Sequence, residues 1–145
     1  MARYAAGFTT TATAAGAAIA DLRSAAGERV YVREIGLFLN AATASSIGLY
    51  RPSTLGTAST SVVGVPVDPA DAAATASIGT AWSVAPAVST NVPLRKAMLP
   101  AAIGNGIIWT FSDRGLVIPV SSSLLLWNWG AGANSVINGY IEWEE

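Results

Sequence analysis

The side chains that most often carry acid–base chemistry or bind metal ions are missing from this chain. It contains no histidine and no cysteine. A Ser-His-Asp triad, a Cys-His pair and a thiolate or imidazole zinc site are therefore excluded. Nine Asp and Glu carboxylates remain as candidates for catalysis. We predict a protein that is not an enzyme, with no cofactor and no metal ion, and we assign no catalytic residue.

The carboxylates closest together in the sequence lie in its last segment, YIEWEE. In a strand Glu142 and Glu144 share one face, and paired carboxylates can hydrolyse glycosidic bonds. Such a spacing is more typical of a solvated face, which is the interpretation we adopt. Asp68 and Asp71 lack the spacing of a calcium-binding EF-hand loop. They suit the start of a helix, with Asp68 as the N-cap and Pro69 at the first helical position.

Three further motifs have a structural interpretation and a chemical one. DRG (residues 113–115) could bind a ligand carboxylate but is more typical of a polar hairpin turn that ends in a flexible glycine. IGNG (residues 103–106) resembles part of a phosphate loop, yet no Lys-Ser/Thr follows it, so we predict a tight turn. LRK (residues 94–96) could contact an acidic partner, and we interpret it as a polar strand edge.

Tryptophan is the remaining residue type that could form a binding site. Aromatic platforms hold sugars, but each tryptophan here lies within an apolar segment rather than an exposed polar loop. We therefore predict core or interface positions for all of them. They are Trp82, Trp109, Trp127, Trp129 and Trp143.

The composition limits the partners of the protein. Hydrophobic residues make up 52% of the chain and charged residues 12%, with a formal net charge of −1. No basic patch of the kind that binds nucleic acid is expected, and no run of about 18 apolar residues indicates a membrane span. The first residues have no continuous apolar region and do not resemble a signal peptide. The absence of cysteine suggests synthesis in a reducing cytoplasm.

Strand patterns dominate the chain and must position these side chains. Residues 28–40 are rich in Val, Ile, Tyr and Phe, although the alternation slips near Gly36, where a bulge or a close backbone contact is plausible. The short connection after this segment would allow a hairpin to residues 45–52. The cleanest alternation lies at residues 135–145. Further strands are expected in residues 55–67, 81–86, 92–100, 106–112, 115–120 and 124–130.

Short strands separated by Gly, Pro, Ser and Asp indicate an all-β fold. We predict an antiparallel β-sandwich, jelly-roll-like, with at most one short helix near residues 69–76. Residues 1–145 form a single domain in this prediction. The ambiguous first 25 residues are interpreted as extended strand. Residues 1–15 could form an extended N-terminal arm that orders on a partner.

The segment LLLWNWG (residues 124–130) is apolar on both faces of the strand that it predicts. Such a strand lies between two covered surfaces, or one of its faces meets another protein chain. We predict that one face contacts a second copy of the chain. The interface residues in this prediction are Leu124, Leu125, Leu126, Trp127 and Trp129.

An ordered series of segments resembles small, Ala- and Gly-rich structural proteins of tailed bacteriophages and prophages. It covers the chain from about residue 28 onward and contains strand and turn patterns rather than a catalytic motif. The segments are REIGLF, SSIGLYRP, DPAD, TAWS, LPAAIGNGIIWTF, RGLVIPVSSSLLLWN and YIEWEE.

The resemblance implies a virion protein with a jelly-roll or related sandwich, of the kind used for capsid decoration (cement). It implies a homotrimer on the capsid surface, made in the host cytoplasm, that binds the major capsid protein and stabilises the shell. The alternative is a receptor- or glycan-binding domain of a tail fibre or another tail-associated protein. No nucleic acid and no membrane are expected as partners.

Overall fold

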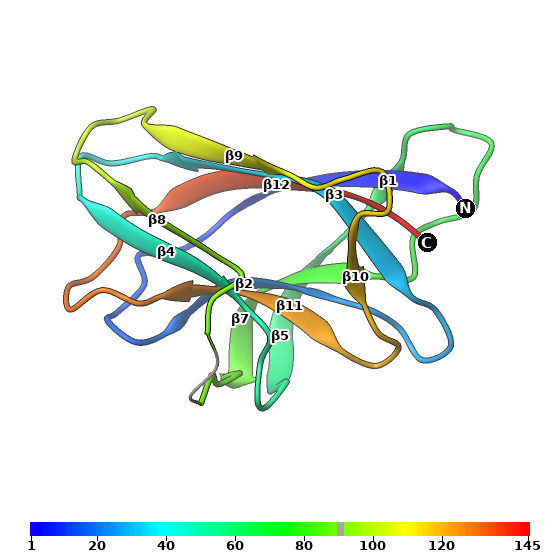
Figure 1. Ribbon diagram of the computed structural model, residues 1–145, viewed down its shortest axis with the longest axis horizontal. Helices are drawn as coiled ribbons and strands as arrows, with labels where there is room; N and C mark the ends of the chain where they lie inside the picture. The colour runs from blue at the N-terminus through cyan, green and yellow to red at the C-terminus, as the bar shows by residue number, and fades with distance from the viewer. Residues whose placement is uncertain (90–91) are drawn as a thin grey trace.

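The chain folds into two antiparallel β-sheets that pack face to face in the computed structural model (Figure 1). The structure describes residues 1–89 and 92–145. None of the described residues lies in a helix, so this part of the chain contains no helix that could cross a membrane. The predicted all-β sandwich is confirmed.

Each sheet has six strands. Sheet A contains β1 (Arg3–Thr9), β3 (Val30–Leu39), β6 (Val65–Pro66), β9 (Gly106–Thr110), β10 (Leu116–Ile118) and β12 (Ile137–Glu144). Sheet B contains β2 (Ala18–Arg23), β4 (Ser45–Tyr50), β5 (Thr57–Val63), β7 (Ser77–Val84), β8 (Arg95–Leu99) and β11 (Ser123–Asn128).

The strand pairing is nested, as in a jelly roll. β1 pairs with β12 and β3 pairs with β9 and β10 in sheet A, while β2 pairs with β11 and β4 with β8 in sheet B. Consecutive pairs therefore alternate between the two sheets. β5, β6 and β7 are inserted between β4 and β8, and they extend the edges of both sheets beside β1 and β2.

The inner faces of the two sheets form one hydrophobic core. β12 shows the expected alternation: Ile137, Ile141 and Trp143 are buried, while Glu142 and Glu144 on the other face remain partly exposed. Central strands with one solvated face are typical of antiparallel sandwiches. Further large, fully buried side chains of this core come from both sheets: Ile19, Leu22, Ile35, Leu37, Leu39, Ile47, Leu49, Ile78, Ile118 and Leu126.

β3 contains the irregularity that the sequence suggests, at a slightly different place. The register with β12 shifts between Glu142 and Trp143, so that Arg33 is the extra residue on β3. The bulge lets Val32 and Ile35 both face the core. Gly36 is instead a close contact, because a Cβ atom there would lie 2.1 Å from the ring of Tyr140.

Three local features that the sequence allows do not form. There is no helix at residues 69–76, which agrees with the prediction of at most one short helix; Asp68 accepts the amide N–H of Ala70 and closes a single turn. The connection after β3 is not a hairpin, because β3 and β4 belong to different sheets.

The third feature is the possible N-terminal arm at residues 1–15, most of which the structure places in the sandwich. β1 lies within sheet A between β12 and β6, with Tyr4, Ala6 and Phe8 in the core. Burial of these side chains and the backbone pairing on both sides of β1 hold the segment in the sandwich.

Candidate functional site

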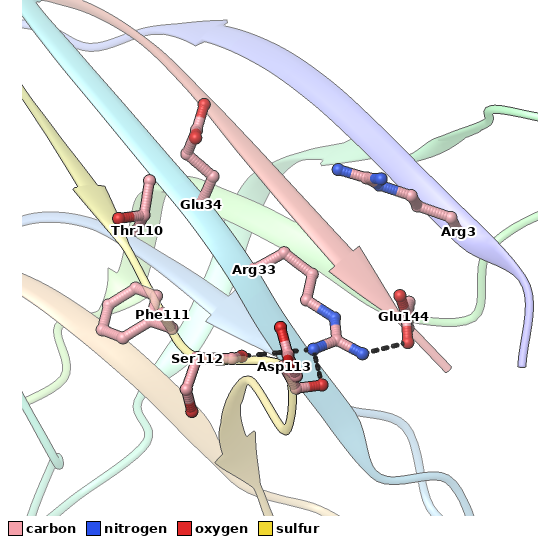
Figure 2. Close-up of a pocket in the computed structure, with 8 residues that line it drawn as sticks. All are labelled: Arg3, Arg33, Glu34, Thr110, Phe111, Ser112, Asp113 and Glu144. Carbon is pink, nitrogen blue, oxygen red and sulfur yellow. Dashed lines mark hydrogen bonds and ion pairs between the residues drawn. The ribbon is translucent and has the colours of Figure 1, made fainter.

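An open groove of about 390 Å³ lies on the outer face of sheet A (Figure 2). β1, β3, β9 and β12 and the segment that follows β9 contribute its lining. The groove is polar for the most part, with Phe111 as the one aromatic ring among the lining residues. These residues are Arg3, Arg33, Glu34, Thr110, Phe111, Ser112, Asp113 and Glu144.

Arg33 organises the groove, and the bulge in β3 places it there. Its guanidinium donates hydrogen bonds to the backbone carbonyls of Ser112, at 3.3 Å, and Asp113. It also pairs with the carboxylate of Glu144 at 2.6 Å (Figure 2). Arg33 therefore ties the turn after β9 to the end of β12.

The other charged groups that β1, β3 and β12 place on this face are also paired within the chain. Arg3 forms an ion pair with Glu142 at 2.5 Å, and the hydroxyl of Tyr140 donates to Glu34 at 2.5 Å. The hydrogen bond to Glu34 raises the pKa of Tyr140 to about 12, with burial as a second cause. The hydrogen bond from Arg33 lowers the pKa of Glu144.

This electrostatic arrangement suits binding better than acid catalysis. A catalytic acid at neutral pH needs a raised pKa, whereas the pKa of Glu144 is lowered. Within the described part of the chain no three carboxylates lie close enough to hold a metal ion. The groove offers hydroxyl groups, carboxylates and an arginine, which can exchange hydrogen bonds with a hydroxylated ligand.

The candidate turns are where the sequence predicts them. Residues 113–115 form a turn between β9 and β10, but the predicted hairpin is wrong, because both strands pair with β3 and not with each other. Gly115 has a φ of 65° with no room for a Cβ beside the carbonyl of Val32. Asp113 lies in the groove. Residues 103–106 form a tight turn in which Gly104 donates its N–H to Leu39. Residues 95 and 96 are the first two of β8, an edge strand of sheet B, as the predicted strand edge requires.

The tryptophans divide between the core and the outer faces. Trp143 and Trp109 belong to the core, and Trp143 stacks on Tyr4 with ring centroids 6.0 Å apart. Trp82, Trp127 and Trp129 are partly exposed. Core positions are thus confirmed for two of the five, and an interface role for the others stays a prediction.

The structure changes the predicted interface. Leu124 and Leu126 face the core, and Leu125 is fully buried on the other face of β11. These three leucines cannot meet a partner, which corrects the prediction. Trp127 and Trp129 remain accessible. The chain covers Leu125 itself, with Tyr50, its neighbour in register, only 7% exposed.

Two loops lie on this outer side of sheet B. Residues 51–56 and 85–88 are joined by a bridge between Thr54 and Ala87. Arg23 on β2 donates to the carbonyls of Leu55 at 2.6 Å and Gly56 at 3.1 Å, which ties the first loop to the sheet. In Figure 1 both loops lie below β2 and β11.

Asn128 at the end of β11 finds all its partners within the chain. Its amide donates to the carbonyls of Thr13, Ala14 and Gly132, and its side-chain oxygen accepts the N–H of Gly130. These bonds join the loop after β1 to the loop after β11. No partner across an interface is required for this buried amide.

Besides the groove, the sequence-based predictions do not reveal the chemical interest of Asp21. Its side chain is completely buried on the outer face of sheet B and pairs with Arg23 at 2.6 Å. Burial raises its pKa to about 6, against the opposing effect of Arg23. The signal was present, because Asp21 is the only acid within the apolar segment AIADL.

Comparisons with known proteins reveal no relative of the chain. No family model, no curated protein and no solved structure matches the chain.

Proposed function

We propose that the protein is a non-enzymatic structural protein of a tailed-phage virion. In this proposal it is a head decoration (cement) protein, which binds the major capsid protein as a homotrimer on the capsid surface and stabilises the shell. The sequence resemblance supports this function, and so does a jelly-roll sandwich whose interior is filled by side chains.

The observation that carries the proposal is the nature of the surface. The charged groups of β1, β3 and β12 on sheet A are paired within the chain, as Arg3 is with Glu142 and Arg33 with Glu144. Large apolar side chains are instead exposed along the sandwich edges. They include Val63, Val65 and Val67 on one edge and Met98, Ile103 and Ile108 on the other. Such a surface suits protein contacts.

A decoration protein needs only modest contacts per subunit. A capsid presents many equivalent sites, and oligomeric subunits engage several of them at once. A protein that binds only the assembled shell stabilises it by mass action. The mechanism therefore requires a rigid subunit and complementary surfaces, but no chemical step.

The test is binding to expanded capsids of the phage that encodes the protein. Purified protein should saturate capsids that lack it and raise the temperature at which they disrupt, as measured by light scattering during heating. Binding to isolated tails or to host cells, with none to capsids, would contradict the decoration role.

The groove on sheet A favours a second candidate, a receptor- or glycan-binding domain of a tail protein. Its hydroxyl, carboxylate and guanidinium groups beside Phe111 match the needs of a hydroxylated ligand. In this case the protein should bind host surface polysaccharide, measured by calorimetry. Thr110→Lys should abolish the binding, whereas Ile108→Lys, two residues earlier on β9 and outside the groove lining, should not.

A further inference from the structure

Charge is distributed unevenly over the molecule. β4, β8, β9 and β11 contain only two charged residues, Arg95 and Lys96, and both are basic. Residues 65–75 also contain only two charged residues, Asp68 and Asp71, and both are acidic. These four side chains are exposed, and none of them forms an ion pair with any other described residue. The chain therefore carries charge of opposite sign, outside any ion pair, in two places.

The basic place combines charge with apolar surface. Lys96 lies in register with Gly48, which in turn pairs with Trp127 on the outer face of sheet B. Its ammonium lies 3.7 Å from the ring centroid of Trp129, a cation–π contact that fixes its position. Met98 follows on the same side of β8 and is 66% exposed. Arg95 precedes Lys96 in β8 and points to the opposite face of this edge strand, where its guanidinium lies 5.8 Å from the ring centroid of Phe111 and is exposed. We call the strand edge formed by Arg95, Lys96, Met98 and Trp129 the basic patch.

The acidic place has the same character with the opposite sign. Val65 and Val67 are 67% and 58% exposed, and they alternate with Pro66 along the edge of sheet A beside β1. Asp68 and Asp71 follow directly in an exposed turn. We call Val65, Val67, Asp68 and Asp71 the acidic patch.

The electrostatic potential near the acidic patch is negative. Tyr4 lies beneath this turn, and its hydroxyl donates to the carbonyl of Ala72 at 3.1 Å. Its pKa is raised first by burial and then by the charges of Glu145, Asp71 and Glu28. The nearby Arg3 is already paired with Glu142, so it does not neutralise the turn.

The two patches lie on opposite edges of the sandwich. β8 closes one end of sheet B, whereas β6 closes the far end of sheet A, beside β1. A twofold dimer through either patch would place like charges against each other, which is unfavourable. Contact of the basic patch with the acidic patch of another copy pairs opposite charges and covers exposed apolar side chains on both sides.

We propose that copies of this chain associate head to tail, with the basic patch of one copy docked on the acidic patch of the next. Head-to-tail contacts form a closed ring when the rotation between neighbours allows it. The inference rests on the self-association included in the proposed function and names the surfaces that carry it.

The first test reverses the charge of the basic patch. We expect the wild-type protein at micromolar concentration to elute from a size-exclusion column as a trimer, with its mass measured by light scattering. The variant R95E/K96E should weaken association by at least about tenfold, and raising the salt from about 0.05 M to 0.5 M should weaken the wild type in the same direction. Arg29 and Arg114 are exposed and belong to neither patch. R29E/R114E makes the same change in net charge and should leave the mass unchanged.

The second test restores complementarity within one chain. D68N/A70K/D71K makes the acidic patch basic, and its asparagine amide keeps a side-chain oxygen that can accept the backbone N–H of residue 70, as the Asp68 carboxylate does in the wild type. This variant alone should dissociate, and its combination with R95E/K96E should associate again. Thermal unfolding shows whether each variant is folded.

The outcomes separate this inference from the proposed function. A monomeric wild type, or a mass that R95E/K96E leaves unchanged, would overturn head-to-tail docking. So would failure of the folded combined variant to associate again. Capsid binding by a monomeric wild type would overturn the docking inference and leave the decoration role intact. Head-to-tail association without capsid binding would do the reverse.

Discussion

The outer faces of the two sheets are built on different principles. On sheet A the central strand β12 presents Tyr140, Glu142 and Glu144 to the groove side, where each is partly exposed and paired with a neighbour. On sheet B the central strand β11 presents Leu125, which is completely buried. One outer face is solvated and charged, while the middle of the other, at Leu125 and Asp21, is buried within the chain.

The comparison explains why LLLWNWG is apolar on both faces. Sheet A separates one core from solvent, so its central strand needs one apolar face. The loops over sheet B create a second buried layer, so β11 lies between two covered surfaces at Leu125. Only Trp127 and Trp129, nearer the end of the strand, stay accessible for a partner.

The largest expected effect tests whether the second layer is a true core. Leu125→Ala should lower the free energy of unfolding by about 3 to 5 kcal/mol, as Leu126→Ala on the inner face should, because both side chains are fully buried. Chemical denaturation measures both. A loss below about 1 kcal/mol for Leu125→Ala alone would mean that the loops over sheet B move into the cavity at little energetic cost.

The second effect concerns the carboxylate buried in that layer. The pKa of Asp21 rises from 3.8 in the unfolded chain to about 6 in the folded one. The folded state therefore binds the proton more tightly, and the stability that this contributes below pH 4 is lost as the pH rises to about 6. We expect a loss on the order of 2 to 3 kcal/mol across this window.

Denaturation at a series of pH values would measure this loss. Asp21→Asn removes the titrating group, so the difference in stability between this variant and the wild type should change with pH in the window from about 4 to 6. A constant difference across the window would show that Asp21 keeps an ordinary pKa. On sheet A the shift runs the other way, since the pKa of Glu144 is lowered.

The regular strands of the two sheets are predictable from the sequence, and the loops on the outer side of sheet B are not. Alternation identifies β12 and its faces, and the slip in phase along residues 28–40 marks the bulge region. Residues 51–56 and 85–88 have no periodicity, because their places are set by contacts such as those of Arg23 with Leu55. The groove is equally hidden, since Arg3, Arg33 and Glu144 meet only after folding.

The missing helix has a similar cause. The Asp68 turn starts as expected, but the alanines after it offer no large apolar side chain to anchor a helical face. A short helix without such packing is marginal in water. The carboxylate of Glu145 instead accepts the N–H groups of Thr75 and Ala76. A tertiary contact from the other end of the chain thus replaces the local preference.

The third effect tests the tight packing on the solvated face. Gly36→Ala would place a Cβ 2.1 Å from the Tyr140 ring, so the ring must move and its hydrogen bond to Glu34 must break. We expect a loss of about 1 to 3 kcal/mol. The pKa of Tyr140, about 12 in the wild type, should fall toward its usual value in an ultraviolet titration.

Gly7 provides a matched control on the other side of the same tyrosine. It pairs with Tyr140 in register, yet a Cβ there would approach no atom closer than 3.8 Å. Gly7→Ala should leave both the stability and the tyrosine titration nearly unchanged. Equal effects from the two substitutions would mean that loss of glycine flexibility, rather than the contact with Tyr140, determines the outcome.

The smallest effect belongs to the ion pair between Arg33 and Glu144. Glu144→Gln should cost less than about 1 kcal/mol at neutral pH, because water screens a partly exposed pair. The lowered pKa of Glu144 means that this stability is present above its unfolded pKa and is lost as the pH falls through the folded one. The difference between Glu144→Gln and wild type should therefore shrink in acid and in high salt.

Arg33→Met should cost more than Glu144→Gln, because Arg33 also holds the carbonyls of Ser112 and Asp113. Equal losses from the two substitutions would show that the turn after β9 does not depend on Arg33. The hydrogen bonds of Arg33 to this turn would then not stabilise the shape of the groove.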